Sequence, residues 1–503
     1  MPRSSPVSPQ SRPAARTDRQ AAAGPAAVTA TSPVGGTARL TGTLGPGAVV
    51  FMVVAAAAPL TVVGGSVPLG IALGNGAAFP AAFAVCCVVL LLFAVGFSAM
   101  SRHVPDAGAF YAYVERGFGR AAGLGAAMLA LVTYTAVQAA VYGYGGAALR
   151  ALVADHGGPE LPWWLWSSVM LAAVATLGFR HIELSGRVLG VLLLCEAGIV
   201  LALDVAVAVK GGDGGLSTAM FHPSAFTDGS PGIGVMFAVA GFIGFEATAV
   251  FRDEARDPER TVPRATYLSL VLIGVFYTVS AWAIVSAWGD TRVVERAGAA
   301  PDALIGDTAD RYLGSGAADA VQVLLVSSLF AAILAFHNVV ARYLFALGGT
   351  GVVPGACGRR HPRHGSPHVA SLVQTGSAAV LVAVFALADL DPVLEVFSWM
   401  SGLATLGVLV LMVATCAAVV VFFRRTRADT RVWHTLAAPL LGLAGLAGCL
   451  ALVMANFPTL IGGSERLAYG LEALVAGSCL LGAVLSRLPG TATPASAAAV
   501  SAT

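Results

Sequence analysis

Long apolar runs separated by short polar segments dominate the pattern along the chain. They recur from residue 46 to residue 487, and the loops between them hold most of the charged residues. A helix needs roughly 20 apolar residues to cross a hydrocarbon core of about 30 Å. The pattern therefore predicts about twelve membrane-spanning helices, over residues 46–72, 79–100, 123–152, 163–179, 187–209, 231–251, 266–288, 317–346, 369–388, 393–423, 433–456 and 468–487.

The composition supports this interpretation. Of 503 residues, 57% are hydrophobic and only 11% are charged, against roughly 25% charged in an average soluble domain. Such a chain lacks the polar residues to cover a soluble globular surface. We therefore predict an all-α polytopic membrane protein in contact with membrane lipid.

The basic residues gather in alternate loops, and cytoplasmic loops are the ones that retain Arg and Lys. With the N-terminus inside, the cytoplasmic segments hold Arg12, Arg16, Arg19, Arg39, Arg102, Arg116, Arg120, Arg180, Arg187, Arg252, Arg256, Arg260, Arg264, Arg359, Arg360, Arg363, Arg424, Arg425, Arg427 and Arg431. The exceptions are Arg150, Lys210, Arg292, Arg296, Arg311 and Arg466. We predict the cytoplasmic membrane with both termini cytoplasmic. The net charge of +2 reflects this sidedness, so no nucleic-acid partner is expected.

The two ends of the chain differ from the apolar core. Residues 1–44 are rich in Pro, Ser, Ala, Thr and Arg and lack apolar periodicity, which predicts a disordered cytoplasmic tail rather than a signal peptide. Residues 491–503 are predicted to form a second disordered tail. The transmembrane domain is expected to cover residues 45–490.

Two of the predicted spans are interrupted, and they lie five helices apart. AAAAPLTVVGG, residues 55–65, contains Pro59, which removes a backbone donor, and AVAGFIGFE, residues 238–246, contains two glycines. Interrupted helices at matching positions are typical of inverted-repeat transporters, which bind substrate there. Proline and glycine are also common in membrane helices, so this pattern alone favours a transporter without establishing one.

Other classes of membrane protein receive less support from the sequence. An intramembrane enzyme would require clustered Asp, His or Cys at catalytic or metal-binding spacing. The spans contain no such cluster, and the seven cysteines lack metal-type spacing. A sensor usually carries a soluble signalling domain, and no loop is long enough for one. We therefore predict no enzymatic activity, no catalytic residues, no metal and no cofactor.

Three segments, in order along the chain, resemble motifs of the amino acid permeases in the amino acid, polyamine and organocation (APC) superfamily. SRHVPDAGAFYAYVERGFGR, residues 101–120, is similar to the loop after the second span, whose common form is Pro-x-Ala-Gly-Gly-x-Tyr-x-Tyr. GFIGFEATAVFRDEARDPERTVPRA, residues 241–265, resembles the sixth span, and NVVARYLFALGGTGVVP, residues 338–354, the end of the eighth. Ala109, Gly348, Gly349 and the segment AAPLT at residues 57–61 depart from the usual pattern.

This resemblance implies a LeuT-type fold with two inverted five-helix repeats. The repeats would cover about residues 45–210 and 231–424, and two further helices would lie within about residues 433–487. It also implies a secondary active transporter that imports amino acids by alternating access, with a proton as the expected coupling ion. The alternative within the same class is an exchanger of amino acids, polyamines or other organic amines. The alternative from a different class is an intramembrane enzyme or sensor.

An interrupted helix offers free N–H groups at one half and free carbonyls at the other, which suits an amino acid zwitterion. We expect the backbone around the first interruption to bind the substrate carboxylate, at Ala58, Pro59, Leu60 and Thr61. Carbonyls around the second are expected to bind the ammonium, at Ala240, Gly241, Phe242, Ile243 and Gly244, with Phe242 also a candidate lid. On the third span, Tyr134 and Gln138 could line a side-chain pocket or hydrogen-bond between helices.

Acids inside the predicted spans are the candidates for coupling or gating. An ionised group at the bilayer centre costs about 2.5 to 3.5 kcal/mol on insertion scales, so such an acid usually faces a cavity or a partner. Glu246 could titrate or gate during transport, or cap neighbouring helix ends. Glu196 could carry the coupling proton or bond across helices. Asp204, near the end of its span, is expected to lie at a solvated rim.

Overall fold

The computed structural model describes residues 45–104, 109–179, 186–222, 227–250, 255–359, 361, 367–462 and 464–487. All of these residues belong to one unit. The tails predicted for residues 1–44 and 491–503 lie outside the described residues.

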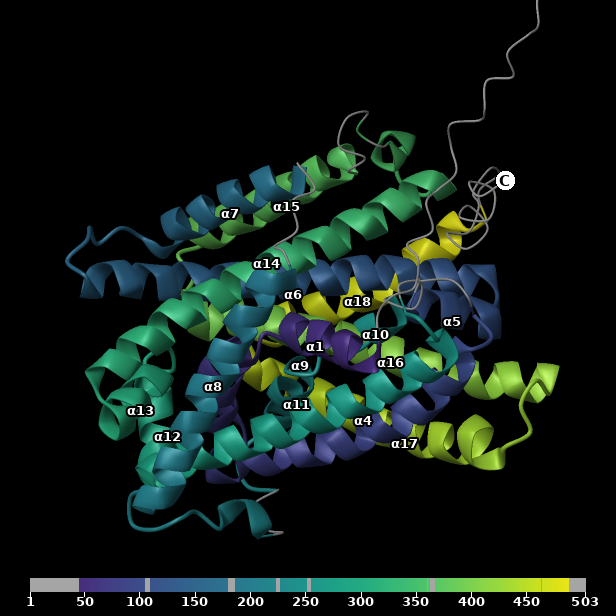
Figure 1. Ribbon diagram of the computed structural model, residues 1–503. Helices are drawn as coiled ribbons and strands as arrows, with labels where there is room; N and C mark the ends of the chain where they lie inside the picture. The colour runs from purple at the N-terminus through teal and green to yellow at the C-terminus, as the bar shows by residue number, and fades with distance from the viewer. Residues whose placement is uncertain are drawn as a thin grey trace, which may run out of the picture. The chain divides into compact units, whose positions relative to one another are not determined.

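The described residues form helices and no β-strand (Figure 1). The α-helices are α1 (Pro46–Ala56), α2 (Pro59–Thr61), α3 (Val67–Leu69), α4 (Phe79–Ser101), α5 (Ala109–Phe118), α6 (Arg120–Asp155), α7 (Trp163–Phe179), α8 (Gly186–Lys210), α9 (Pro231–Ala240), α10 (Ala247–Val250), α11 (Pro258–Trp288), α12 (Asp290–Ala299), α13 (Leu304–Leu313), α14 (Ser315–Thr350), α15 (His368–Leu387), α16 (Ser398–Thr426), α17 (Ala438–Leu460) and α18 (Glu465–Leu485). The π-helical segments are η1 (Val62–Ser66), η2 (Gly70–Asn75), η8 (Pro392–Phe397) and η9 (Trp433–Ala437), and the 3₁₀ segments are η3 (Gly76–Ala78), η4 (Ala219–Phe221) and η7 (Gly355–Gly358).

Helical segments lie in each of the ranges that the apolar pattern predicts. Within the described residues, nine helices are long and apolar enough to cross a membrane. The remaining predicted spans are shorter or interrupted: α7 has 17 residues, and α9 ends after 10. The all-helical, multi-span architecture is thus confirmed, while the number of twelve spans stays a prediction.

The first interrupted helix breaks where its sequence removes backbone donors and bulk. α1 ends at Ala56, and Ala58 adopts a left-handed conformation with φ 46°. Pro59 then occupies the first turn of α2, where its missing N–H has no helical partner to lose. The helix continues as η1, α3 and η2 to Asn75. The predicted interruption at Pro59 is therefore present.

The second interrupted helix breaks at its glycines. α9 ends at Ala240, a run of turns follows, and α10 begins at Ala247. Gly244 has φ 113°, a conformation that a residue with a Cβ rarely adopts. The interruption therefore lies between Ala240 and Ala247, as the sequence predicts.

The two interrupted helices are joined at one end and run in opposite directions. The end of η2 meets the start of α9, where the Ser230 N–H donates to the Gly74 carbonyl at 3.0 Å. A Cβ at Gly74 would lie 2.8 Å from the Gly234 nitrogen, so the close approach requires glycine. α9 also contacts η1 and α3, so the two broken helices run antiparallel beside each other from this junction.

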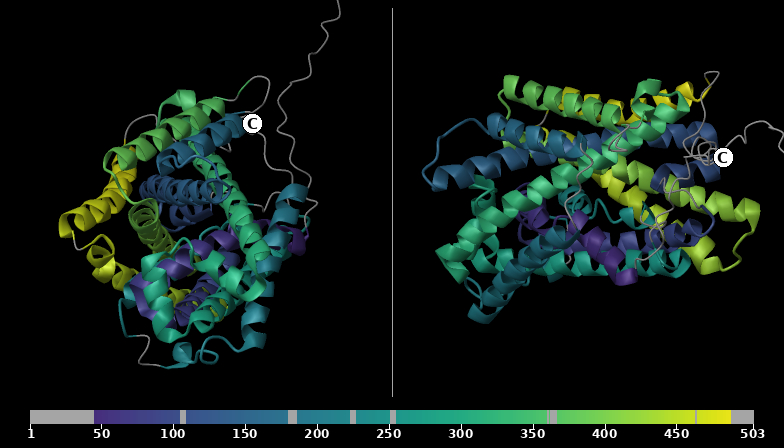
Figure 2. Two further views of the ribbon diagram at one scale, coloured as in Figure 1. Left: turned by 90° about the vertical axis from the view of Figure 1, so that its left-hand side faces the viewer. Right: turned by 45° about the horizontal axis from the view of Figure 1, so that its top comes forward.

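Other helices cover the interrupted pair. α6 packs against α14 and α16, α16 packs against α9 of the second broken helix, and α14 packs against α2 of the first. More peripheral helices form further layers: α7 lies along α15 in Figure 1 and in both views of Figure 2. The interruptions are thus enclosed by long, continuous helices.

Two short amphipathic helices, α12 and α13, gather several basic residues that go against the predicted sidedness. Arg292 pairs with Asp213, Arg296 pairs with Asp307, and an Arg311 nitrogen lies 3.6 Å from an Asp213 oxygen. The Lys210 ammonium donates to the Tyr312 carbonyl at 2.8 Å. These exceptions to the charge distribution therefore have local acidic or carbonyl partners.

Candidate functional site

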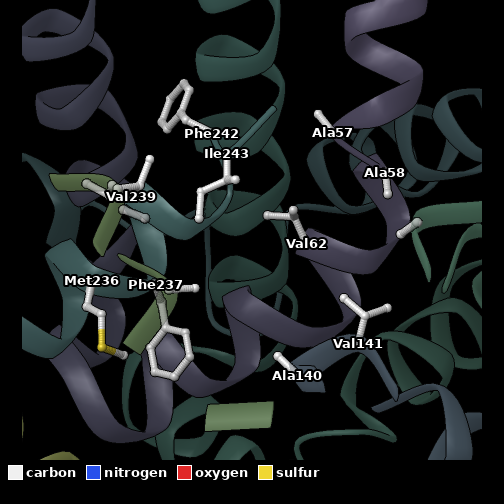
Figure 3. Packing of buried hydrophobic residues seen from close by; sticks show 14 of the residues in the cluster. Ala57, Ala58, Val62, Ala140, Val141, Met236, Phe237, Val239, Phe242 and Ile243 are labelled. Atoms are coloured by element: carbon white, nitrogen blue, oxygen red, sulfur yellow. The ribbon is translucent and has the colours of Figure 1, made fainter. Parts of the chain in front are cut away.

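A cavity of about 60 Å³ lies between the two interruptions. Residues from both broken helices line it together with residues of α6, α14, η8 and α16: Ala57, Ala58, Thr61, Val62, Ser66, Val137, Ala140, Val141, Ala240, Ile243, Ala332, Phe336, Phe397, Ser401 and Ala404. Figure 3 shows Ile243 and Val62 extending toward each other from the two broken helices. The cavity thus brings together segments more than 180 residues apart in sequence.

The lining of this cavity is mostly apolar. Among the residues that line it, none carries a charge, and the polar side chains are the hydroxyls of Thr61, Ser66 and Ser401. The two aromatic residues are Phe336 and Phe397. Any charged group of a ligand would therefore have to meet backbone groups, hydroxyls or water.

The first interruption leaves backbone donors near the cavity. Leu60 and Thr61 lie in the first turn of α2, where N–H groups have no carbonyl one turn earlier in the same helix. Outside α2, neither N–H group donates to a backbone carbonyl among the described residues. On the other side of the break, the Ala57 carbonyl accepts a hydrogen bond from the Tyr277 hydroxyl at 3.3 Å. The break therefore has backbone donors on its α2 side, while the carbonyl on its α1 side accepts a hydrogen bond from α11.

The second interruption uses several of its backbone groups internally. The carbonyls of Val239, Ala240 and Phe242 accept from the N–H groups three residues on, at 3.0 to 3.2 Å. Each carbonyl has a second lone pair, so these bonds leave acceptor capacity. Ala240 and Ile243 reach the cavity lining.

Glu246 closes the second interruption from within. Its carboxyl accepts from the Gly244 N–H at 2.9 Å and from the Tyr134 hydroxyl at 2.6 Å, and its side chain is 3% exposed. The Tyr134 ring stacks on Phe336, a cavity residue, with centroids 6.2 Å apart. Tyr134 therefore connects Glu246 to Phe336 in the cavity lining.

Glu196 on α8 is connected to the cavity by two hydroxyls. The Ser328 hydroxyl donates to the Glu196 carboxyl at 2.9 Å, and the Thr61 hydroxyl donates to Ser328 at 3.3 Å. The Leu60 backbone N–H contributes a further hydrogen bond to the same carboxyl. Because Thr61 lines the cavity, this chain links the cavity to a carboxyl that is 5% exposed.

The structure brings some of the predicted site residues to the cavity and leaves others beside it. Ala58, Thr61, Ala240 and Ile243 line it. The others lie next to those residues or behind them: Pro59, Leu60, Gly241, Phe242, Gly244, Tyr134, Gln138, Glu246 and Glu196.

Phe242 and Gln138 lie behind the cavity wall. The Phe242 ring is directed away from Ile243 (Figure 3) and packs against Phe83 and Tyr277, each with centroids 6.3 Å from it. Gln138 accepts from Gln374 of α15 and donates weakly to the Ile333 carbonyl at 3.5 Å. The structure therefore places Gln138 in a bond between helices, the alternative that the sequence left open.

Several lining residues were not anticipated from the sequence. Val137, Ala140 and Val141 share one face of α6, as do Ala332 and Phe336 on α14 and Ser401 and Ala404 on α16. Their spacing of three or four residues is the helical signal that could have grouped them. Apolar residues occur on every face of these helices, however, so the spacing does not say which face meets a cavity.

The prediction that Asp204 lies at a solvated rim is wrong. The sequence placed it at a solvated rim, but the structure buries it to 6% exposure, and its carboxyl accepts from the Ser280 hydroxyl of α11 at 2.8 Å. The end of α8 is covered by α11 and α13, which excludes solvent from this carboxyl.

Within the part of the chain that the structure describes, no three His, Cys, Asp or Glu side chains gather as a metal site would require.

Comparisons with known proteins agree on one family. A family model described as amino acid permease matches residues 44–477. The low-affinity putrescine importer PlaP of Escherichia coli (strain K12) is 24% identical over 326 residues, which cover 61% of this chain and 67% of that protein. The branched-chain amino acid permease BcaP of Bacillus subtilis (strain 168) is 24% identical over 394 residues, 74% of this chain and 79% of that protein.

A third relative is the gamma-aminobutyric acid permease of Escherichia coli (strain K12), 26% identical over 306 residues, 57% of this chain and 61% of that protein. Membership among importers and permeases places the chain with transporters rather than enzymes, and the apolar helices make it a multi-pass membrane protein. The match over residues 44–477 shows that this chain belongs to the amino acid permease family of the APC superfamily.

Proposed function

We propose that this protein is a secondary active transporter that imports amino acids across the cytoplasmic membrane by alternating access, driven by protons. The observation that carries the proposal is a single cavity lined by both helix interruptions and linked through Thr61 and Ser328 to the buried Glu196. Such an arrangement supplies the two things that a proton-coupled permease needs: a substrate site between broken helices and a titratable group in contact with it.

The substrate's charged ends would be bound by backbone groups of the two breaks. Donors in the first turn of α2, around Ala58, Leu60 and Thr61, would bind the carboxylate, because a helix N-terminus favours negative charge. Carbonyls around Ala240 and Ile243 would accept from the ammonium. The adjacent backbone of Gly241, Phe242 and Gly244 would complete this second half-site.

Glu196 would carry the coupling proton. Both hydroxyls of the chain donate toward its carboxyl, so a proton can pass from the cavity by successive hydroxyl transfer. Protonation of Glu196 would weaken its hydrogen bonds from Leu60 and Ser328, which would release the Leu60 N–H and, through Ser328, the Thr61 hydroxyl to bind the substrate carboxylate. Proton loading and substrate binding would thus favour each other.

Glu246 and Tyr134 would act in gating. Glu246 holds the second interruption in its present geometry through Gly244, and Tyr134 connects it to α6. A change in the geometry of this break therefore requires the Tyr134–Glu246 bond to lengthen or part.

The wider architecture is part of the same proposal. Two antiparallel broken helices, five predicted spans apart, are what a LeuT-type fold with inverted repeats would place at its centre. In this arrangement about twelve spans cross the membrane, and both termini are cytoplasmic, in line with the positive-inside rule.

The test is uptake of labelled amino acids by proteoliposomes, with and without an inward proton gradient. Gradient-dependent accumulation of at least one amino acid is expected, and it should disappear in Glu196→Gln. The matched control is Asp204→Asn, a second buried acid on α8 whose partner is Ser280 and not the cavity; it should retain accumulation. Exchange without gradient-driven accumulation would replace import by exchange, and no movement of any amino acid would overturn the proposal.

A further inference from the structure

We propose that the cavity selects amino acids with an uncharged aliphatic side chain of small to medium size and rejects diamines and cationic or acidic side chains. This inference rests on the proposed function, since it assigns the substrate class of the same cavity. The relatives include a putrescine importer and a branched-chain amino acid permease. Of these two kinds of substrate, the inference assigns aliphatic amino acids to this cavity.

The walls beyond the two breaks offer apolar contacts. Val137 and Val141 of α6, Ile243 of the second break and Phe336 of α14 contribute only hydrocarbon surface. Burial of a branched aliphatic side chain strengthens binding by about tenfold or more relative to a ligand without one. The part of the cavity that would hold the substrate side chain therefore binds a hydrocarbon group more tightly.

A second charged group on the ligand would find no counter-charge. The lining residues are uncharged, and the two nearby acids already have partners: Glu196 bonds Ser328, and Glu246 bonds Tyr134 and Gly244. A charged group buried without a partner is strongly disfavoured. The second ammonium of putrescine or lysine, and the side-chain carboxylate of glutamate, are therefore excluded.

The two aromatic walls set the upper size limit, and each is held by a tyrosine bonded to a different broken helix. Phe397 packs against the Tyr144 ring at 5.2 Å between centroids, and the Tyr144 hydroxyl donates to the Gly64 carbonyl of η1 at 2.7 Å. Phe336 stacks on Tyr134, which bonds Glu246 beside the second break. Neither ring can move aside without loosening a tyrosine, so a large aromatic side chain cannot be admitted at low cost.

The first experiment is a competition assay on the unmodified protein. Uptake of labelled L-leucine into proteoliposomes is measured with excess unlabelled L-valine, L-isoleucine, putrescine, L-lysine, L-glutamate or L-tryptophan. L-Valine and L-isoleucine should compete, and the other four should be weaker by about tenfold or more. Competition by putrescine or L-lysine as strong as that by L-valine would overturn the inference.

Binding is measured separately from transport, as stabilisation of the detergent-purified protein against thermal unfolding by each compound. Stabilisation by the three aliphatic amino acids alone supports the selectivity even if accumulation does not require a proton gradient. Equal stabilisation by putrescine or L-lysine overturns it while leaving amino acid transport in place. The two proposals can therefore fail independently.

Two substitutions sharpen the test. Ser401→Asp adds a carboxylate to the lining and should admit L-lysine, whereas the matched Ser401→Asn adds similar volume without charge and should not. Phe397→Leu shortens one aromatic wall and should improve competition by L-tryptophan severalfold. If Ser401→Asp folds, as judged by thermal unfolding, but gains no more L-lysine binding than Ser401→Asn, the absence of charge is not what excludes cations.

Discussion

The two helix interruptions face one cavity but satisfy their loosened backbone in different ways. At the first, the Ala57 carbonyl accepts from the Tyr277 hydroxyl of α11, and the Leu60 N–H in the first turn of α2 donates to Glu196 of α8. At the second, Glu246 folds back on Gly244 within the same segment. The groups that partner the first break thus come from other helices, whereas the acid that caps the second belongs to the break itself, with Tyr134 of α6 as its other donor.

This difference separates the roles of the two buried acids. Glu196 belongs to a helix outside the breaks and is linked to the cavity through two hydroxyls, the route along which the proposed mechanism exchanges its proton with the site. Glu246 is a structural element of the break that it caps. Chemical coupling is therefore expected at the first break and mechanical control at the second.

The largest contrast is expected from breaking the link at the first interruption. Ser328→Ala removes the hydroxyl between Thr61 and Glu196, so gradient-driven accumulation should fall to the level seen without a gradient. Ser327→Ala is the matched control, because its hydroxyl donates to the Leu324 carbonyl of its own helix at 2.8 Å. Proteoliposome uptake measures both. Equal accumulation by the two variants would mean that the hydroxyl chain does not carry the proton.

At the second interruption, removal of Glu246 should act mainly on stability. Glu246→Ala leaves the Gly244 N–H and the Tyr134 hydroxyl without their acceptor, at a cost of about 1–3 kcal/mol for each donor. Tyr134→Phe removes one of the two bonds and should cost about 1 kcal/mol. Thermal unfolding in detergent compares them. A Glu246→Ala protein as stable as the native one would remove the capping role.

Substitutions at the positive-φ residue of each break test the difference between the breaks directly. Gly244→Ala introduces a Cβ at φ 113° and should destabilise by about 1–3 kcal/mol, whereas Ala58→Gly relieves a left-handed alanine and should be nearly neutral. Gly376→Ala on α15, with nothing within 4 Å of a new Cβ, is the control for glycine replacement and should not destabilise. Effects of the same size and sign at both breaks would remove the asymmetry.

The smallest effect is expected at Tyr277. Tyr277→Phe leaves the Ala57 carbonyl without its donor, and hydrogen bonds between membrane helices average about 0.6 kcal/mol. A small loss of thermal stability with retained uptake is expected. A loss as large as that of Glu246→Ala would show that the first break depends on one neighbour as strongly as the second depends on its acid.

The sequence predicted the helices and both interruptions, because these follow from local features. The length of each apolar run places the helices. Pro59 and the glycines around residue 241 destabilise helical backbone through local effects that do not depend on tertiary packing. The family resemblance, carried by three motifs, is confirmed by the match over residues 44–477.

The composition of the cavity could not be predicted in the same way. Apolar residues occur on every face of α6 and α14, so hydropathy does not fix the rotation of these helices about their own axes. Gln138 faces Gln374, 236 residues away, rather than a substrate pocket, and this depends on how α6 packs on α15. Asp204 was placed near solvent because α13, which covers that end of α8, is not predictable from α8 itself.

The tyrosines behind Phe336 and Phe397 have a consequence for inhibition. Each aromatic wall is tied to one broken helix, through Tyr134 to the second and through Tyr144 to the first. An oversized ligand that pushes a wall outward would therefore also displace a helix that moves in the proposed alternating-access cycle. Such a compound is expected to inhibit transport rather than to be transported slowly. Inhibitors should therefore be sought among ligands slightly larger than the largest substrate.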